Sequence, residues 1–428
     1  MSDDAVGPPM STRPSAQVES PRAWLRLFTS LALMTIGGSG MYAVIVVLPL
    51  VQAEFSITRS IASLPYTVTM VGFGLGGIVM GRLSDRYGVI VPVLIGALSL
   101  GLGFIAASAA PGILVFMLVQ GVVIGFLGSS ATFAPLVADI SFWFTRRRGI
   151  AVAICISGNY LAGATWPPIL QYFFDAYGWR TTFQGVGVFC LLAMLPLSLV
   201  LRGRPPALEA ATTGPGIRHG SSKPLGMAPG MLQLWLSIAG VACCVAMSMP
   251  QVHIVAYCGD LGFGAARGAE MLSLMLGFGI VSRLASGWIS DRIGGLRTLL
   301  LGSTLQGIAL LLFIPFDELA TLYVISAMFG LFQGGIVPSY AIIVREYFTP
   351  LEAGRRVGTV LMATLFGMAL GGWLSGAIFD LTGSYDAAFL NGIAWNLVNI
   401  TIVVALLRRA GGRPFTFSSA RAGATAAR

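Results

Sequence analysis

Long apolar runs divide this chain, and they restrict its possible folds more than any other feature. Each run is about as long as a helix that crosses a bilayer, roughly 20 residues. The composition agrees, because 56% of the 428 residues are hydrophobic and only 10% are charged, which is too apolar for a soluble protein. Lipid-exposed backbone must satisfy its own hydrogen bonds, so we expect an all-α polytopic membrane protein. Twelve runs occur, at 27–50, 61–81, 89–109, 112–135, 149–172, 181–201, 231–257, 268–290, 296–315, 319–342, 357–379 and 387–407.

The basic residues predict how these spans are oriented. With the N-terminus inside, twenty-two Arg and Lys residues fall on the inner side, and three fall outside, namely Arg59, Arg180 and Arg267. The positive-inside rule therefore predicts that both termini are cytoplasmic. The basic residues are spread over short segments rather than gathered on a soluble surface, so nucleic acid is not an expected partner.

The sequence also divides into two related halves. Segment 203–230 is a long polar interruption rich in Pro and Gly, which we interpret as a cytoplasmic linker. It would separate two six-helix bundles, and similar motifs recur in both at an offset of 205 or 206 residues. Parallel repeats of this kind predict two bundles around a central site. The expected parts are a cytoplasmic tail at 1–26, bundles at 27–202 and 231–407, and a second cytoplasmic tail at 408–428.

The stretch Gly81-Arg-Leu-Ser-Asp-Arg-Tyr-Gly88 recurs as Gly287-Trp-Ile-Ser-Asp-Arg-Ile-Gly294. This motif and the duplicated twelve-span pattern resemble the major facilitator superfamily and its signature loop. Within the motif, we expect the glycine to allow close helix packing, the aspartate to cap a helix, and the arginines to meet helix C-termini or carboxylates. The expected gating residues are Gly81, Arg82, Asp85, Arg86, Asp291 and Arg292.

Two further stretches, 143–158 and 280–287, resemble the monocarboxylate transporter branch of that superfamily. The first has an aromatic pair, a basic triplet and then small residues. The second implies that Arg283, in the eighth run, binds the substrate carboxylate. The chain departs from the animal members in having Gly279 where they have an aspartate, and in lacking a lysine in the first run. This chain therefore cannot couple a proton through an aspartate and a lysine at those two positions.

Arg283 is informative without the resemblance. A guanidinium stays charged, and placing one mid-membrane costs ~2.5–3.5 kcal/mol on insertion scales. Gly279 and Gly287, one turn to either side, supply no acidic partner. We therefore expect Arg283 to bind a carboxylate in a bidentate manner.

The resemblance also bears on the charge of the substrate. The related oxalate:formate exchangers have an additional lysine in span eleven, whereas the run at 357–379 of this chain has no basic residue. One positive charge balances one carboxylate, so we expect a monocarboxylate.

Five other residues are candidate substrate contacts. His253 is a candidate partner for a proton or a carboxylate, because imidazole titrates in the useful range, and it could equally be a packing residue. The resemblance implies that spans one, four, seven and ten line the cavity. Span five adds a further candidate. For each candidate from these spans, a packing role is an equal alternative. The candidates from these spans are Tyr42, Thr132, Tyr340 and Asn159. Three aspartates near span ends, Asp139, Asp175 and Asp380, are expected to be helix caps.

These observations predict a secondary transporter of small monocarboxylates such as lactate or pyruvate, coupled to a proton and working by alternating access. Its partners would be the carboxylate, the proton and membrane lipid, with a monomer as the functional unit in a bacterial inner membrane. The alternatives are a proton-independent carboxylate exchanger and a drug exporter. The five cysteines show no metal-ligand spacing, and no catalytic motif occurs, so we expect no metal, cofactor or enzymatic activity.

Overall fold

The structure is a computed structural model that describes residues 19–144, 147–203 and 224–410. Within these ranges, twelve helical segments are long and apolar enough to cross a membrane, and no strand occurs. The prediction of an all-α polytopic membrane protein is therefore confirmed. The helices are α1 (Pro21–Gly37), α2 (Ser39–Phe55), α3 (Arg59–Tyr87), α4 (Ile90–Ser108), α5 (Ile113–Leu118), η1 (Val119–Gly128), η2 (Ser129–Thr132), α6 (Ala134–Trp143), α7 (Arg148–Tyr177), α8 (Trp179–Val200), η3 (Pro224–Gly226), α9 (Pro229–Asp260), α10 (Ala265–Ile293), α11 (Gly295–Leu312), α12 (Leu319–Gln333), α13 (Ile336–Tyr347), α14 (Pro350–Thr382) and α15 (Asp386–Ala410).

Three of the twelve spans are interrupted helices, and glycines lie at the breaks. α1 and α2 together make the first span and meet at Gly38. α12 and α13 make the tenth span and meet at Gly334 and Gly335. The fourth span passes from α5 through the π-helical turn η1 and the short η2 to α6. Such breaks free backbone groups and re-aim side chains near the centre of a bundle.

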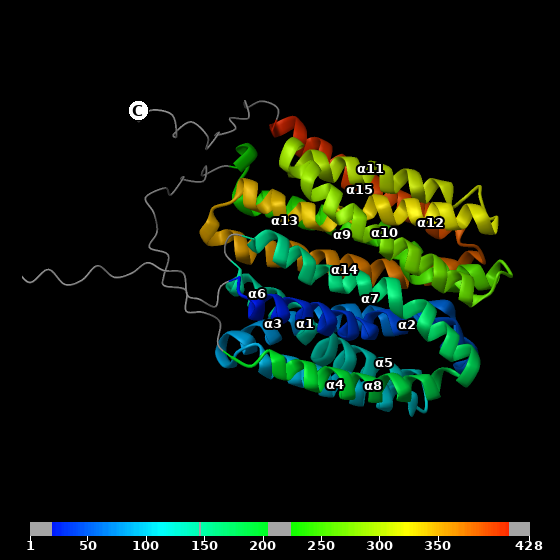
Figure 1. Cartoon of the computed structure of the whole chain (residues 1–428). Helices are drawn as coiled ribbons and strands as arrows, with labels where there is room; N and C mark the ends of the chain where they lie inside the picture. Colours follow the sequence, from blue (N-terminus) through cyan, green and yellow to red (C-terminus); the bar gives the residue numbers. More distant parts are fainter. Residues whose placement is uncertain (1–18, 145–146, 204–223, 411–428) are drawn as a thin grey trace, which may run out of the picture.

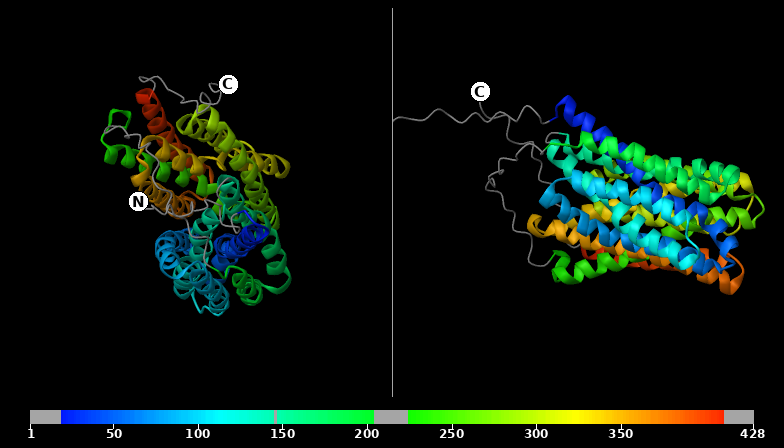
Figure 2. Two further views of the ribbon diagram at one scale, coloured as in Figure 1. Left: turned by 60° about the vertical axis from the view of Figure 1, so that its left-hand side comes forward. Right: turned by 90° about the horizontal axis from the view of Figure 1, so that it is seen from below.

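The helices run roughly parallel to one long axis and form two adjoining groups (Figures 1 and 2). α1–α8 form the first half and α9–α15 form the second, with α7 and α14 in the middle of Figure 1. α1 begins and α15 ends at the same end of the bundle, which we call the termini end; the opposite end is the far end. The first helix begins at Pro21 rather than near residue 27, because Ser20 accepts a hydrogen bond from the Ala23 amide and Pro21 suits a first turn.

The repeated motifs have the same backbone geometry in both halves. Gly88 and Gly294 end α3 and α10 with the same φ of 83°. Gly178 and Gly383, which lie 205 residues apart in the sequence, follow α7 and α14 with φ values of 77° and 70°. A residue with a Cβ rarely adopts this region, so each position favours glycine. The sequence repeat is therefore also a repeat of helix endings.

The two halves touch at the far end and near the middle, and they separate toward the termini end. Along α3 and α14, Thr67 Oγ1 donates to the Ala369 carbonyl at 3.0 Å, and a Cβ added at Gly376 would lie 2.9 Å from the Arg59 carbonyl oxygen. Closer to the termini end on the same helices, a Cβ added at Gly81 or Gly358 would meet no atom within 4 Å. The space between the halves therefore widens toward the termini end.

With the halves separated at this end, the signature-loop residues lack the contacts expected of them. Gly81 makes no close helix contact in this conformation, contrary to expectation. Arg86 and Arg292 lie over the rings of Tyr87 and Trp288, at 5.2 and 3.8 Å, rather than against carboxylates. Within the described ranges, three other motif residues have no hydrogen bond or ion pair with another side chain. These are Arg82, Asp85 and Asp291.

A buried ion pair holds the first half together near the termini end. Arg26 Nε and Nη2 donate to the two carboxylate oxygens of Asp139 at 2.6 and 2.9 Å. Both side chains are almost completely buried, and the guanidinium lies 4.7 Å from the centre of the Trp143 ring. Asp139 is thus an ion-pair partner rather than the expected helix cap.

Candidate functional site

A cavity of about 200 Å³ lies between the two halves. α2, α3 and α7 of the first half and α9, α10, α13 and α14 of the second half contribute to its wall. The residues that line it are Met41, Tyr42, Ile45, Tyr66, Met70, Phe73, Phe133, Asn159, Tyr160, Cys244, Met247, Gln251, Leu276, Arg283, Val337, Leu361, Thr364, Leu365 and Met368. Arg283 is the single charged residue among them.

The Arg283 side chain has an aromatic neighbour and no carboxylate. Its guanidinium carbon lies 4.3 Å from the centre of the Tyr160 ring on α7. Among the described residues, no hydrogen bond or ion pair reaches the guanidinium, and its Nε is buried without a partner. A ring face attracts a cation by ~0.5–2 kcal/mol but leaves its in-plane N–H donors unused. The donors of Arg283 therefore remain free for a ligand.

Gly279 explains how Tyr160 reaches this position. A Cβ added at Gly279, one turn before Arg283 on α10, would lie 2.7 Å from Tyr160 Cδ1 and still closer to Cε1. Any larger side chain would have to displace the ring. The space beside Gly279 is thus filled by the ring of a tyrosine from another helix.

Two of the predicted contact residues lie at the same cavity as Arg283. Tyr42 from α2 and Asn159 from α7 both line it. Tyr42 lies within electrostatic reach of Arg283 and Tyr160, and its ring packs against Gly163, where a Cβ would lie 2.6 Å from Tyr42 Cζ. Neither the Tyr42 hydroxyl nor the Asn159 amide has a hydrogen bond to another described residue. The structure therefore brings three predicted residues together, each from a different helix.

Thr132 and Tyr340 are placed away from this cavity. Thr132 belongs to the short turn η2, where its hydroxyl donates to the Ser129 carbonyl at 2.9 Å and its side chain fills the space beside Gly37. Tyr340 is fully buried inside the second half, and its hydroxyl donates to Asn399 Oδ1 at 3.0 Å. The expectation that these two residues line the cavity therefore fails, because both face the interior of their own half.

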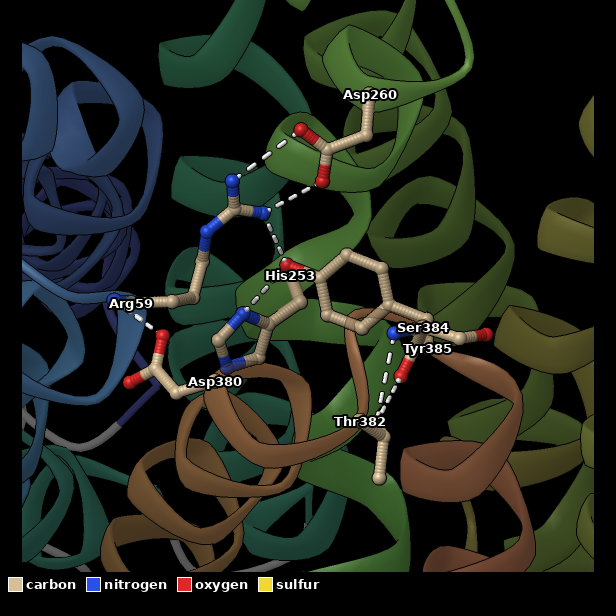
Figure 3. A network of polar contacts seen from close by, with 7 residues as sticks. All are labelled: Arg59, His253, Asp260, Asp380, Thr382, Ser384 and Tyr385. Atoms are coloured by element: carbon tan, nitrogen blue, oxygen red, sulfur yellow. Dashed lines mark hydrogen bonds and ion pairs between the residues drawn. The ribbon is translucent and has the colours of Figure 1, made fainter.

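His253 also lies away from the cavity, within a polar network at the far end (Figure 3). Arg59 from α3 donates to both carboxylate oxygens of Asp260 on α9, at 2.7 and 3.2 Å, and to the Tyr385 hydroxyl at 2.6 Å. The amides of Arg59 and Ser60 donate to the two oxygens of Asp380, both at 2.8 Å, so Asp380 caps α3 from the other half. We call Arg59, His253, Asp260, Asp380 and Tyr385 the far-end clamp.

The hydrogen bonds of the clamp fit one tautomer of His253. Its Nε2 lies 2.8 Å from the Gly372 carbonyl, which can only accept, so Nε2 carries the hydrogen. Nδ1 then accepts from the Tyr385 hydroxyl at 3.2 Å, and that oxygen in turn accepts from Arg59. Burial raises the pKa of Tyr385, so its hydroxyl keeps the proton that it donates. A chain of hydrogen bonds thus links a neutral histidine to the ion pair between the halves.

Sequence reasoning missed the residues that complete the cavity. Tyr66, Met70 and Phe73 line it from one face of α3, and their spacing is that of a single helical stripe. That spacing was the available signal, although it does not tell a cavity wall from a packed core. Nothing in the sequence indicated that the Tyr160 ring would stack on Arg283.

A membrane-spanning bundle made of two repeated halves, with one cationic group in a cavity between them, has the architecture of a secondary transporter. The sequence model described as Major Facilitator Superfamily matches residues 28–316 and 270–426. The chain therefore belongs to the Major Facilitator Superfamily, and the resemblance found in the sequence is confirmed.

Among individual relatives, Monocarboxylate transporter 13 of Bos taurus is 30% identical over 360 residues, covering 81% of this chain and 79% of that protein. Monocarboxylate transporter 11 of Homo sapiens is 28% identical, covering 72% of this chain and 66% of that protein. A bacterial homologue of the human lysosomal transporter Spinster, solved in an inward-facing and occupied conformation, superposes with a TM-score of 0.66. It is 15% identical and covers 92% of this chain and 96% of that chain, so it supports the fold alone. The relatives named from sequence are animal proteins, and placement in a bacterial inner membrane stays a prediction.

Proposed function

We propose that this membrane protein is a secondary transporter of monocarboxylates and that Arg283 is the group on which the carboxylate docks. One observation carries the proposal: the Arg283 guanidinium lines a cavity between the halves, and its N–H donors make no hydrogen bond to a described residue. A planar carboxylate matches the fork of guanidinium donors. The similarity to monocarboxylate transporters supports the same substrate class.

The charge of the cavity argues for one carboxylate. Arg283 is the single charged residue in the lining, so a bound monoanion would neutralise it. A dianion would leave a net negative charge in a medium of low dielectric constant, at a cost of several kcal/mol. Asn159 and Tyr42 would supply further hydrogen bonds to the carboxylate or to the atom next to it.

In the orientation predicted by the basic residues, the termini end faces the cytoplasm. The cavity would then be open inward, and the far-end clamp would close the outer side. Transport would require the clamp to release while the termini ends of the two halves approach each other, around the site at Arg283. The uncontacted glycines at that end, Gly81 and Gly358, leave room for such an approach.

For the coupled proton, we propose His253, acting through the clamp rather than through contact with the substrate. The neutral ring accepts from Tyr385 at Nδ1. A proton on Nδ1 would remove that acceptor and place a positive charge near Arg59, which would weaken the link between the halves. His253→Gln would then keep substrate binding and lose the dependence of transport on a proton gradient.

A second candidate function is proton-independent exchange of carboxylates. It is favoured by the composition of the cavity, whose lining contains no Asp, Glu or His. In that case the substrate charge would be balanced by a second carboxylate moving in the opposite direction.

Uptake into proteoliposomes separates these functions. Radiolabelled pyruvate and lactate would be offered with and without an imposed pH gradient, and with unlabelled pyruvate preloaded inside. Proton symport predicts accumulation driven by the gradient; exchange predicts stimulation by preloading alone. Arg267→Gln is a suitable control for the Arg283→Gln variant, since Arg267 forms an exposed surface pair with Glu270. No uptake of either acid under either condition would refute pyruvate and lactate as substrates.

A further inference from the structure

We propose that this cavity selects monocarboxylates with a bulky apolar or aromatic body, larger than lactate or pyruvate, and that Tyr66, Met70 and Phe73 are the selecting residues. The inference rests on the proposed function, because it takes Arg283 as the docking point for the carboxylate. It adds what the rest of the substrate must look like.

The cavity has two unlike sides. The groups able to hold a carboxylate, namely Arg283, Asn159 and Tyr42, come from α10, α7 and α2. α3 and α14 contribute a second set that is almost entirely apolar or aromatic. That set, which we call the apolar wall, consists of Tyr66, Met70, Phe73, Leu361, Leu365 and Met368. A carboxylate bound at Arg283 would therefore direct the rest of the molecule toward apolar side chains.

The cavity is also larger than a three-carbon acid needs. Waters occupy about 30 Å³ each in the liquid, and bonded carbons sit closer together than waters do, so a cavity of about 200 Å³ holds roughly ten heavy atoms. Lactate or pyruvate would fill about half of that space and would leave the apolar wall without contacts. Lactate and pyruvate have six heavy atoms each, and a further four to six, as in a branched alkyl or a phenyl group, would fill it.

Two other polar side chains of the lining form hydrogen bonds within the protein. Gln251 donates its amide to Gln333 Oε1 at 2.7 Å, and Thr364 donates its hydroxyl to the Leu361 carbonyl at 2.7 Å. The Thr364 hydroxyl hydrogen and one of the two Gln251 amide hydrogens are therefore not free for a substrate hydroxyl. A body rich in hydroxyl groups would replace only part of its bonds to water in this cavity, which disfavours sugar acids.

The apolar wall is shaped to receive a ring. Phe73 meets Phe133 edge to face, with ring centres 5.6 Å apart and planes at 63°. The Tyr66 ring is fixed against Gly372, where a Cβ would lie 2.9 Å from Tyr66 Cδ1. Met70 and Met368 line the same wall, and unbranched thioether side chains adapt to aromatic partners of different shape. Rigid aromatic groups beside adaptable methionines suit a family of aromatic acids.

The test compares phenylpyruvate with pyruvate, which share the same carboxylate and keto group. KM for uptake of each would be measured in proteoliposomes with the wild-type chain, Phe73→Ala and Phe366→Ala. Phe366 neighbours Leu365 on α14 but is exposed on the outside of the bundle, so it is the matched control. In the wild type and in the control, we expect KM for phenylpyruvate to be at least about tenfold below that for pyruvate, the gain from burying one ring.

In Phe73→Ala, KM for phenylpyruvate should rise until that preference falls to about twofold or less. Measurable pyruvate uptake by the variant shows that it folds. A wild-type KM for phenylpyruvate equal to or above that for pyruvate would overturn the inference and leave the proposed function standing. If neither acid is transported or bound, the proposed function is refuted, and this inference is refuted with it.

Discussion

Arg59 and Asp260 form an ion pair that joins the two halves of the molecule, with Arg59 Nη1 2.7 Å from Asp260 Oδ2. The arginine is almost fully buried, and the aspartate is 39% exposed. Exposed pairs contribute little on their own, ~0–1 kcal/mol. This pair is strengthened by Tyr385, which shares the same guanidinium, and by Asp380, which caps the helix that carries Arg59.

We expect Asp260→Asn to loosen the far end of the bundle. The variant removes the charge that holds Arg59 and leaves the guanidinium with Tyr385 alone, so the open population at the far end should rise several-fold. Spin labels at Ser56 and Ser384, on opposite halves, would report this as a longer distance by pulsed electron resonance. Asp317→Asn makes the same charge change at an exposed position of the same end and should leave the distance distribution unchanged; equal distributions in both variants would contradict the clamp.

A methyl group at Gly279 should impair the site without unfolding the protein. Gly279→Ala places a Cβ 2.7 Å from Tyr160 Cδ1, which forces the ring away from Arg283. We expect KM for the carboxylate to rise by about tenfold. Gly277→Ala is the matched control on the same helix, because the nearest atom to its added Cβ is 3.9 Å away. Equal KM values in the two variants would show that the position of the Tyr160 ring does not affect carboxylate binding.

The ring of Tyr160, rather than its hydroxyl, should matter for Arg283. Tyr160→Phe keeps a ring face under the guanidinium, so KM should change by about twofold or less. Tyr160→Ala removes an attraction of ~0.5–2 kcal/mol, and KM should rise by roughly two- to thirtyfold. Concentration-dependent uptake measures both. If the phenylalanine variant were as impaired as the alanine variant, the hydroxyl would be the important group.

The pair formed by Arg26 and Asp139 should be a large contributor to stability. Asp139→Asn leaves a buried guanidinium without its counter-charge, a change that costs about 3–5 kcal/mol in buried pairs. The Tm of the detergent-solubilised protein should fall by several degrees or more. Glu352→Gln, which breaks a half-exposed pair with Arg356, should shift Tm much less, because i,i+4 pairs contribute about 0.3–0.5 kcal/mol. Equal shifts in the two variants would show that burial adds nothing.

The membrane spans could be predicted from the sequence because apolar runs are local features, and the repeated motifs indicated two halves because repeats are visible without a structure. Apolar runs of helix length report directly on burial in lipid, and the motif around Gly88 and Gly294 has the same backbone conformation in both halves. Arg283 was identifiable because a charge within an apolar run is rare and expensive.

Contacts between distant helices could not be predicted in the same way. Arg59 lies 201 residues from Asp260 and 326 from Tyr385, and each of them resembles an ordinary charged or aromatic residue at a span end. Thr132 and Tyr340 were expected in the cavity because their spans line it. The face that each presents depends on the η2 turn and on Asn399, neither of which shows a periodic pattern.

Binding of pyruvate and phenylpyruvate to the purified protein and to Arg283→Gln tests the central claim most directly. Isothermal titration needs no transport cycle, so it isolates docking from gating. Glutamine keeps hydrogen-bond donors and removes the charge, and a charge-assisted pair contributes about 1.5–3 kcal/mol. The account predicts a Kd at least tenfold higher for both acids in the variant, with an unchanged Kd in Arg267→Gln. An unchanged Kd in Arg283→Gln would contradict it.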